Sequence, residues 1–500
     1  MRRSHRWAQA LLLAFVYATP LFFVLRMDQV TDTDIWWHLR IGEWICEHRA
    51  IPHTELFSTS AAGQPWAAYS WLFEVLTFGL FHKFGLVGIV FYTSGTVVAI
   101  AAAVHHLLRR LSSDFTFGVL LTFFAMCTMA RDYTPRPWLL TILFFTLELN
   151  ILLQARKTGS VREFLWLPPI FVLWTNIHIQ FVDGLILLAM ASMEPMLAKR
   201  WPAIQTKLSV KKMAGVSVAC LIATLVNPYG AGIYKVAYDL VAQAASLDQI
   251  IELAAIPFRH LDDWCLLFIA LAAVFVLARV KRPGFFETAL LAFSILVSFR
   301  MQRDVWVLTI VGCAIVISYF SRKDSDQFQV QVGDVPVVAF ATGVFAALAF
   351  MIMGVSNGRL QAKLENNLPM QAVNTIRKQN WDGPIFNTYN WGGFLIWTMH
   401  RPVSMYGRNT DYGVEKVLRT METWDGESGW DADPDLVRAN LVIAPAQQPL
   451  VQLLRLQPCM EQTYSDDIAV LFVGRDKASE GLQHADNTFC RNRLELRARR

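Results

Sequence analysis

The sequence has few charged residues and lacks any pattern that would hold a structural metal ion. Only 17% of its 500 residues are charged, whereas 54% are hydrophobic, a balance that argues against a large soluble enzyme. Its seven cysteines form no C-x-x-C pair and show no zinc-ligand spacing. No internal repeat and no nucleotide-binding α/β pattern is found, and we attribute the net charge of +5 to membrane topology rather than to nucleic-acid binding.

Long apolar runs dominate the first 354 residues. A helix needs about 20 mostly apolar residues to cross about 30 Å of hydrocarbon, and about eleven such runs, eleven to thirteen at most, precede Gly354. The chain is therefore predicted to be a polytopic α-helical membrane protein with a C-terminal extracytoplasmic α/β domain. The runs lie roughly at residues 8–25, 86–108, 115–130, 138–153, 164–177, 181–197, 214–226, 264–278, 286–298, 305–320 and 337–353.

Basic residues alternate between the two sides of these predicted spans. Loops assigned to the inside hold eighteen Lys and Arg residues, and the outside loops before the last span hold ten. Because short basic loops stay in the cytoplasm, the N-terminus is predicted to be cytoplasmic and the C-terminal domain extracytoplasmic. The first span follows a basic segment but has no convincing cleavage site before Asp28, so it is expected to be an uncleaved anchor.

The predicted organisation has four parts. A transmembrane domain covers residues 1–354 and includes a long first outside loop at 27–70; a linker at 355–363, an α/β domain at 364–475 and a charged tail at 476–500 follow. In the α/β domain, strands are expected at 384–389, 394–397, 441–444 and 469–473, and helices at 413–421 and 449–456. Cys459 and Cys490 both lie outside, where a disulfide is permitted, but sequence alone does not establish the pair.

The first outside loop is longer than a connector requires and concentrates acidic and aromatic residues. Asp32 and Asp34 precede the run Trp36-Trp37-His38, which is typical of an interfacial helix whose carboxylates face water. Asp32 and Asp34 are therefore candidate catalytic residues. One alternative is that Asp32 caps a helix and Asp34 sits in its first turn. Another, weaker one is that Asp-Thr-Asp binds a metal ion.

Two pairs of arginines lie in separate outside loops. Arg131 and Arg136 flank one short segment, and Arg300 and Arg303 flank another. Guanidinium groups at a membrane boundary are suited to a lipid phosphate, which they bind bidentately. These four arginines are predicted to bind the phosphate of a donor, with simple snorkelling to water as the alternative.

Polar residues between two further spans are candidates for a sugar or acceptor pocket. Asn176 and His178 interrupt the apolar runs and are assigned, with His38, to such a pocket, although a tight interhelical turn would use the same residues. In the C-terminal domain, Asn387, Trp391, Arg408 and Asp411 could contact sugar as well. The pair Gly392-Gly393 suggests a tight strand connection instead, and a structural role for that region is favoured.

These motifs together resemble integral-membrane glycosyltransferases of the GT-C superfamily, in particular bacterial mannosyltransferase-like or Rgt-like members. The resemblance rests on Asp-Thr-Asp-Ile-Trp-Trp-His-Leu-Arg after the first span, on Arg136-Pro137-Trp138 and on Arg300-Met301-Gln302-Arg303, with further matches at 174–178, 227–230, 389–397 and 406–408. It implies a polyprenyl-phosphate sugar as donor and an acidic residue of the first loop, Asp34 or Asp32, as the base. The chain departs from the pattern where Ile179 follows His178 and where Asp304 follows Arg303.

The resemblance further implies inverting transfer to a glycolipid, glycan or protein acceptor of the cell envelope, in the inner (cytoplasmic) membrane of a bacterium. No cofactor is assigned, and a divalent metal ion stays an open alternative. The expected partners are the lipid-linked donor, the acceptor and membrane lipids, without nucleic acid. Two other classes of function remain: a multi-span transporter or lipid flippase, and a non-catalytic envelope assembly protein.

Overall fold

The protein folds into two compact units. The computed structural model describes residues 2–160, 162–201, 204, 206–244, 251–320, 334–408, 412–475 and 488–498. One unit comprises Met1–Gln29 and Gly88–Val355, and the other comprises Val30–Val87 and Ser356–Arg500. The expected boundary near Gly354 coincides with this division. Most of the first outside loop, however, groups with the C-terminal residues, and Asp411 lies outside the described part of the chain.

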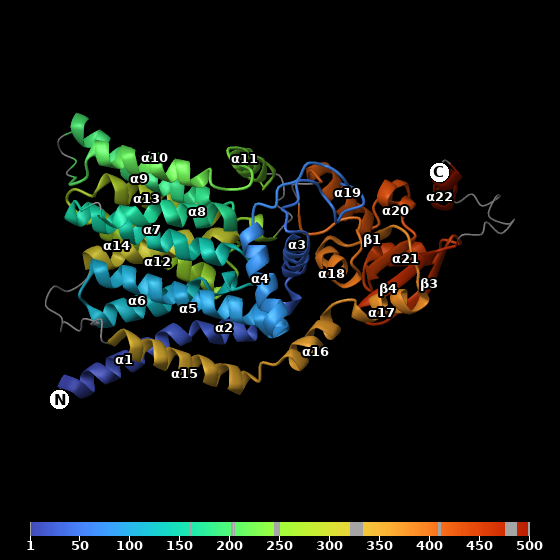
Figure 1. Ribbon diagram of the computed structural model, residues 1–500, viewed down its shortest axis with the longest axis horizontal. Helices are drawn as coiled ribbons and strands as arrows, with labels where there is room; N and C mark the ends of the chain where they lie inside the picture. The colour runs from blue at the N-terminus through green and yellow to red at the C-terminus, as the bar shows by residue number, and fades with distance from the viewer. Residues whose placement is uncertain are drawn as a thin grey trace. The chain divides into compact units, whose positions relative to one another are not determined.

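The first unit is helical. Short 3₁₀ turns separate several of its helices: η2 (Ala130–Asp132), η3 (Arg162–Trp166), η4 (Ile251–Leu253) and η5 (Gln302–Asp304). The helices are α1 (Arg2–Ala18), α2 (Pro20–Arg26), α5 (Leu86–Leu111), α6 (Phe115–Thr128), α7 (Trp138–Thr158), α8 (Leu167–Ile177), α9 (Phe181–Arg200), α10 (Val210–Thr224), α11 (Gly232–Ala244), α12 (Leu261–Ala278), α13 (Phe285–Arg300), α14 (Val305–Phe320) and α15 (Val335–Met353), as labelled in Figure 1.

Seven segments in the described residues are long and apolar enough to cross a membrane. They comprise α1 with α2, then α5, α7, α9, α12, η5 with α14, and α15. All eleven predicted spans coincide with helices, but α6, α8, α10 and α13 have only 11 to 16 residues, or about 17–24 Å at 1.5 Å per residue. The length and composition of these segments support the predicted membrane character, whereas the count of about eleven stays a prediction.

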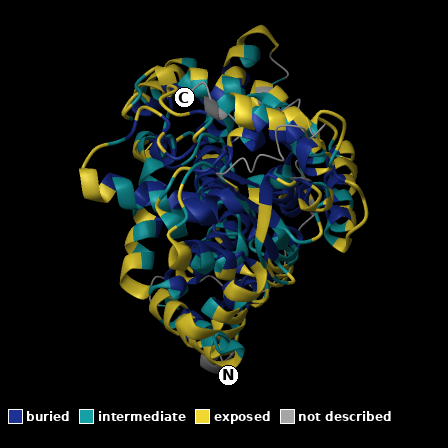
Figure 2. Ribbon diagram, turned by 90° about the vertical axis from the view of Figure 1, so that its right-hand side faces the viewer, coloured by how far each residue is buried: buried dark blue, intermediate teal, exposed yellow. Residues whose placement is uncertain are grey.

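The outward faces of these helices carry large apolar side chains. On α15, the exposed fractions of Phe340, Met351 and Ile352 are 76%, 75% and 80%, and Figure 2 marks such exposed residues on the outer helices in yellow. Such faces are unfavourable in water but match the hydrocarbon of a bilayer. Helix α15 packs along α1 and α2, as Figure 1 shows.

The second unit combines helices with a four-stranded mixed sheet in the order β1-β2-β4-β3. Strands β1 and β2 are parallel, while β4 runs antiparallel to both of its neighbours. The elements are α3 (Ile35–His48), α4 (Trp71–Phe84), α16 (Asn357–Asn367), α17 (Met370–Gln379), β1 (Ile385–Asn387), α18 (Tyr389–Met399), α19 (Val414–Trp424), α20 (Pro434–Arg438), β2 (Leu441–Pro445), α21 (Pro449–Arg455), β3 (Met460–Ser465), β4 (Ala469–Gly474) and α22 (Thr488–Ala498).

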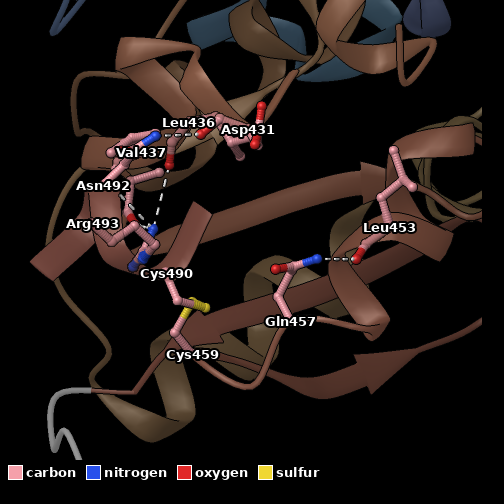
Figure 3. Close-up of a disulfide and its surroundings, with 10 residues drawn as sticks. Asp431, Leu436, Val437, Leu453, Gln457, Cys459, Cys490, Asn492 and Arg493 are labelled. Carbon is pink, nitrogen blue, oxygen red and sulfur yellow. Dashed lines mark hydrogen bonds between the residues drawn. A yellow bond between two sulfur atoms is a disulfide. The ribbon is translucent and has the colours of Figure 1, made fainter. Parts of the chain in front are cut away.

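A disulfide joins the end of the sheet region to the last helix. Cys459 and Cys490 are bonded, with their Cα atoms 5.7 Å apart, and both are buried in the core that covers one face of the sheet. Beside them, Arg493 donates hydrogen bonds to the backbone oxygens of Leu436 and Val437 (Figure 3). Part of the expected tail is therefore the ordered helix α22.

The predicted strand at 394–397 is wrong, because these residues belong to α18. Its glycines explain the error: a Cβ atom on Gly393 would come within 2.8 Å of the backbone oxygen of Thr33, so the pair that suggested a tight strand connection instead lets α18 pack closely against α3. The predicted strands at 441–444 and 469–473 and the helices at 413–421 and 449–456 are confirmed. Strand β3 was not predicted.

Candidate functional site

Asp32 holds the start of α3 in the second unit. Its Oδ1 accepts hydrogen bonds from the backbone N–H groups of Asp34 and Ile35, at 3.0 and 3.1 Å. These donors have no partner inside the helix, so a carboxylate at this place stabilises the helix end. Asp32 therefore caps the start of α3, as the alternative interpretation of its sequence position predicts.

Asp34 occupies the position just before α3, but its side chain makes no capping bond. The hydroxyl of Thr33 lies 3.4 Å from its Oδ1, and the carboxylate is only half-buried. It approaches Gly407 so closely that a Cβ atom there would overlap it, with the indole nitrogen of Trp37 2.9 Å from the same point. The carboxylate of Asp34 is therefore positioned without being used to cap the helix.

His38 lies one helical turn further along α3, completely inside the protein. Its Nδ1 is 3.2 Å from Oε1 of Glu74 on α4, and the exposed fractions of the two residues are 3% and 1%. Burial raises the pKa of Glu74 to about 8, and the nearby charge of Arg408 opposes that rise. Oε2 of Glu74 has no hydrogen-bond partner among the described residues.

Arg408 lies in a cage of aromatic rings, which we call the aromatic cage. Its guanidinium carbon is 4.2 Å from the ring centre of Trp66, 5.4 Å from that of Trp37 and 5.6 Å from that of Tyr69. One Nη donates to the backbone oxygen of Ala67 at 2.9 Å. Such contacts stabilise a buried cation. Within the described residues, the indole nitrogens of Trp37 and Trp66 find no acceptor, so the cage retains unused polar groups.

In the first unit, Arg131 and Arg136 are both engaged with acidic residues. Arg131 forms ion pairs with Asp262 and Asp263 at the start of α12. Arg136 is buried, lies over the ring of Trp138 at 5.2 Å and is 3.4 Å from Glu252. Arg131 therefore already has two counter-ions, whereas one contact of Arg136 is with a half-exposed carboxylate that an incoming anion could displace.

Two 3₁₀ turns at the same end of the first unit each carry an Arg-Asp pair: Arg131-Asp132 on η2 and Arg303-Asp304 on η5. Oδ1 of Asp304 accepts a hydrogen bond of 2.8 Å from Gln180. Asp132 is buried and its Oδ2 has no partner in the described part of the chain. Burial raises its pKa well above the usual value, and Arg131 opposes this.

Arg303 differs from Arg131 in that its Nε is buried and has no hydrogen-bond partner among the described residues. Arg300 ends α13 and is exposed. The structure thus brings Arg131, Arg136 and Arg303 to one end of the first unit together with acidic groups, and of these three Arg303 has the clearest unused donor.

The remaining predicted pocket residues have structural contacts. Nδ2 of Asn176 donates to the backbone oxygens of Val172 and Val226, each at 2.7 Å, which ties α8 to the end of α10. Nδ1 of His178 is 2.9 Å from Oγ1 of Thr141. Burial, assisted by the charge of Arg303, lowers the pKa of His178 to about 3, so this imidazole is neutral.

Sequence reasoning missed Glu74, Asp132 and Asp304 as members of these clusters. Glu74 lies in an apolar helix without any motif, so only its contact with His38 reveals it. A signal for the other two was present, since an Arg-Asp pair recurs at the ends of two apolar runs. In the described residues, no group of three or more His, Cys, Asp or Glu side chains is placed to hold a metal ion.

The fold is similar to that of a solved membrane oligosaccharyltransferase. The crystal structure of the Archaeoglobus fulgidus oligosaccharyltransferase in the apo form matches with a TM-score of 0.57 and 12% identity, covering 88% of this chain and 70% of that one. The same enzyme tethered through a disulfide to an acceptor peptide with the NVT sequon matches with a TM-score of 0.51 and 12% identity, covering 88% and 69%. No protein-family model and no curated protein matches the sequence. At this identity the likeness establishes the architecture, which agrees with the GT-C resemblance.

Proposed function

We propose that the protein is a membrane glycosyltransferase that moves a sugar from a polyprenyl-phosphate donor to an acceptor of the cell envelope. The observation that carries the proposal is the oligosaccharyltransferase fold over 88% of the chain, which agrees with the resemblance of its sequence motifs. Asp34 adds support, because its carboxylate lies in the predicted loop and is not consumed by capping.

Asp34 acts as the base in this proposal. An acceptor hydroxyl is a weak nucleophile, and a carboxylate within hydrogen-bond reach takes its proton as the oxygen attacks the anomeric carbon of the donor. The bond from that carbon to the phosphate oxygen breaks with its electron pair, and the lipid phosphate leaves. One direct displacement inverts the configuration. Asp32 holds the α3 terminus that positions Asp34 and is not the base.

Arg303 and Arg136 stabilise the phosphate in this proposal. Charge grows on the phosphate oxygens as the sugar leaves, and guanidinium groups fixed beforehand stabilise that charge without reorganising. The unpartnered Nε of Arg303 and the exchangeable contact of Arg136 with Glu252 support this assignment. The neutral imidazole of His178 can form a hydrogen bond without adding charge.

The acceptor is a glycan or a protein. An oligosaccharyltransferase of the same fold has been trapped with an acceptor peptide, which supports a chain-like acceptor. We assign the protein to a bacterial cytoplasmic membrane with its N-terminus inside, as the distribution of basic residues predicts. The disulfide between Cys459 and Cys490 agrees with an oxidising compartment for the C-terminal domain.

The test compares the envelope glycolipids and glycoproteins of cells that lack the protein and carry the native chain, Asp34→Asn or Asp32→Asn. Asp32→Asn is the matched control, because an asparagine also caps a helix. We expect one sugar mass to disappear in the deletion, to return with the native chain and Asp32→Asn, and to stay absent with Asp34→Asn at equal membrane levels. Full restoration by Asp34→Asn would exclude it as the base, and unchanged sugar masses would exclude the transferase.

A specific observation favours transport as the second candidate. Glu148 lies in the middle of α7, fully buried, and neither carboxylate oxygen has a hydrogen-bond partner among the described residues. Ionisable groups at the middle of a span are typical of transporters. If Glu148→Gln abolishes the cellular phenotype while Asp34→Asn does not, transport is the better assignment.

A further inference from the structure

A large cavity lies within the first unit, between α5, α15 and the first two helices. It measures about 1700 Å³, well above the roughly 300–1,000 Å³ of pockets for small ligands. Its apolar walls include small residues, such as Gly95 and Ala99 on α5 and Gly343 and Ala346 on α15. The rings of Phe91 and Phe350, 5.5 Å apart, border one end.

The lining of the cavity on α5 is nearly as long as the hydrocarbon core of a bilayer is thick. Its lining on α5 extends from Phe91 to Arg109, which corresponds to about 27 Å at 1.5 Å per residue. A single leaflet supplies only half of the roughly 30 Å of hydrocarbon. An occupant that fills the cavity lengthwise therefore needs an apolar chain longer than one leaflet.

Charge is found at the opposite end from the Phe91 and Phe350 rings, and it is positive. Arg109, Arg110 and Lys157 line this end, and no acidic residue of the described chain is part of the lining. Arg110 is paired with Glu163, at 2.7 and 3.0 Å, and one Nη of Arg109 donates to the backbone oxygen of Ser113 at 2.8 Å. Asp114 also lies close enough to act on Arg109, so three basic residues face two nearby carboxylates and this end keeps a small net positive charge beside an apolar channel.

This charged end is separate from the candidate site. Helix α7 starts just after Arg136 and reaches Lys157 at its other end, so the two lie about 30 Å apart along its axis. Two polar groups on α5 also line the cavity: Nε2 of His105 and Oγ of Ser94 have no hydrogen-bond partner within the described residues.

We propose that this cavity binds a linear lipid phosphate, with the phosphate beside Arg109, Arg110 and Lys157 and one chain longer than a leaflet along α5. A cation cluster binds the anionic head, and the apolar walls bind the chain. The inference goes beyond the proposed transfer reaction, because the head lies at the other end of the unit and binding requires no catalysis.

Native mass spectrometry of the delipidated full-length protein tests the proposal, with undecaprenyl phosphate as probe. Farnesyl phosphate has the same head with a short chain, undecaprenol lacks the phosphate, and phosphatidylglycerol is anionic with two acyl chains. We expect undecaprenyl phosphate to bind at least about tenfold more tightly than each of the three. The loss of one strong charged contact, or of several buried methylene groups, is enough to weaken binding by that factor. Equal binding of phosphatidylglycerol or farnesyl phosphate would overturn the proposal.

Variants locate the binding. Nothing lies within 4 Å of a Cβ atom built on Gly95, Gly343 or the exposed Gly215 of α10, so a side chain can start at each position without a clash at Cβ. The double variant Gly95→Leu/Gly343→Leu fills the cavity and should weaken binding about tenfold or more, whereas Gly215→Leu should not. Arg109→Gln/Lys157→Gln should lower the affinity for undecaprenyl phosphate but not for undecaprenol.

The variant Arg136→Gln/Arg303→Gln distinguishes this site from the proposed donor site. Binding that survives in this variant and is lost in Gly95→Leu/Gly343→Leu supports the cavity, whatever the outcome of the transfer assay. Binding that is unchanged in Gly95→Leu/Gly343→Leu refutes the cavity and leaves the proposed function untouched.

Discussion

Replacing Glu74 by glutamine should remove a pH dependence of stability from the second unit. The pKa of Glu74 is raised by burial from 4.5 to about 8, with Arg408 opposing. Between these values the folded chain holds a proton that the unfolded chain has lost, so stability falls as pH rises, by about 1.4 kcal/mol per pH unit. The loss is complete above about pH 8, where it reaches about 5 kcal/mol.

Glu74→Gln keeps the size of the side chain and can still form a hydrogen bond with Nδ1 of His38. We expect it to match the native chain near pH 5 and to exceed its stability at pH 9 by up to about 5 kcal/mol, a shift in Tm on the order of 10–20 °C for a unit of this size. The shift in Tm is measured by thermal unfolding in detergent, followed by tryptophan fluorescence between pH 5 and 9. The matched control is Glu47→Gln, on the exposed face of α3. Parallel curves for the native chain and Glu74→Gln would refute the reasoning, since Glu74 would then be ionised in the fold.

Three further predictions concern the same unit. Gly407→Ala introduces a Cβ atom where the carboxylate of Asp34 lies. Because only the end of that side chain must move, we expect reduced sugar transfer with little loss of Tm. The control Gly358→Ala adds a Cβ atom with nothing within 4 Å and should leave transfer unchanged. Asp32→Ala should cost about 1 kcal/mol through loss of the α3 cap, and Asp32→Asn little, as measured by thermal unfolding; equal losses would contradict the capping role. Cys459→Ser/Cys490→Ser removes a cross-link between residues 31 positions apart. It should lower the free energy of unfolding by up to about 4 kcal/mol and make α22 sensitive to proteases. If α22 is cleaved no faster than in the native chain, packing alone holds this helix.

Much of the architecture could be predicted from apolar patterning, because the bilayer imposes one rule on every span. Each predicted span coincides with a helix. The grouping of 30–87 with the C-terminal residues could not be predicted, since it depends on contacts between α3 and α18 that are more than 300 residues apart in sequence. The run 394–397 shows the same limit: a short apolar segment fits a strand or a helix, and only packing against Thr33 and Trp37 selects the helix.

The candidate site divides in the same way. Asp34, His38, Arg136 and Arg303 were selected as candidates because their residue types are unusual beside apolar runs. The role of Asp32 as a cap and the pair of His38 with Glu74 depend on three-dimensional contacts, and burial, which fixes the pKa of Glu74, is not encoded in any local motif.

The second unit is assembled from two stretches of chain, Val30–Val87 and Ser356–Arg500, and this order matters for synthesis. The 268 residues of Gly88–Val355 separate them, so at about 5–20 residues per second roughly 13 to 54 s pass between their production. During that time Trp36, which packs on Phe394 and Trp397 in the finished unit, has no partner from α18. The newly made first stretch must therefore be sheltered, by lipid or by a chaperone, until the last third of the chain arrives, and a chain that stops early leaves the indole of Trp36 without its packing partners on α18.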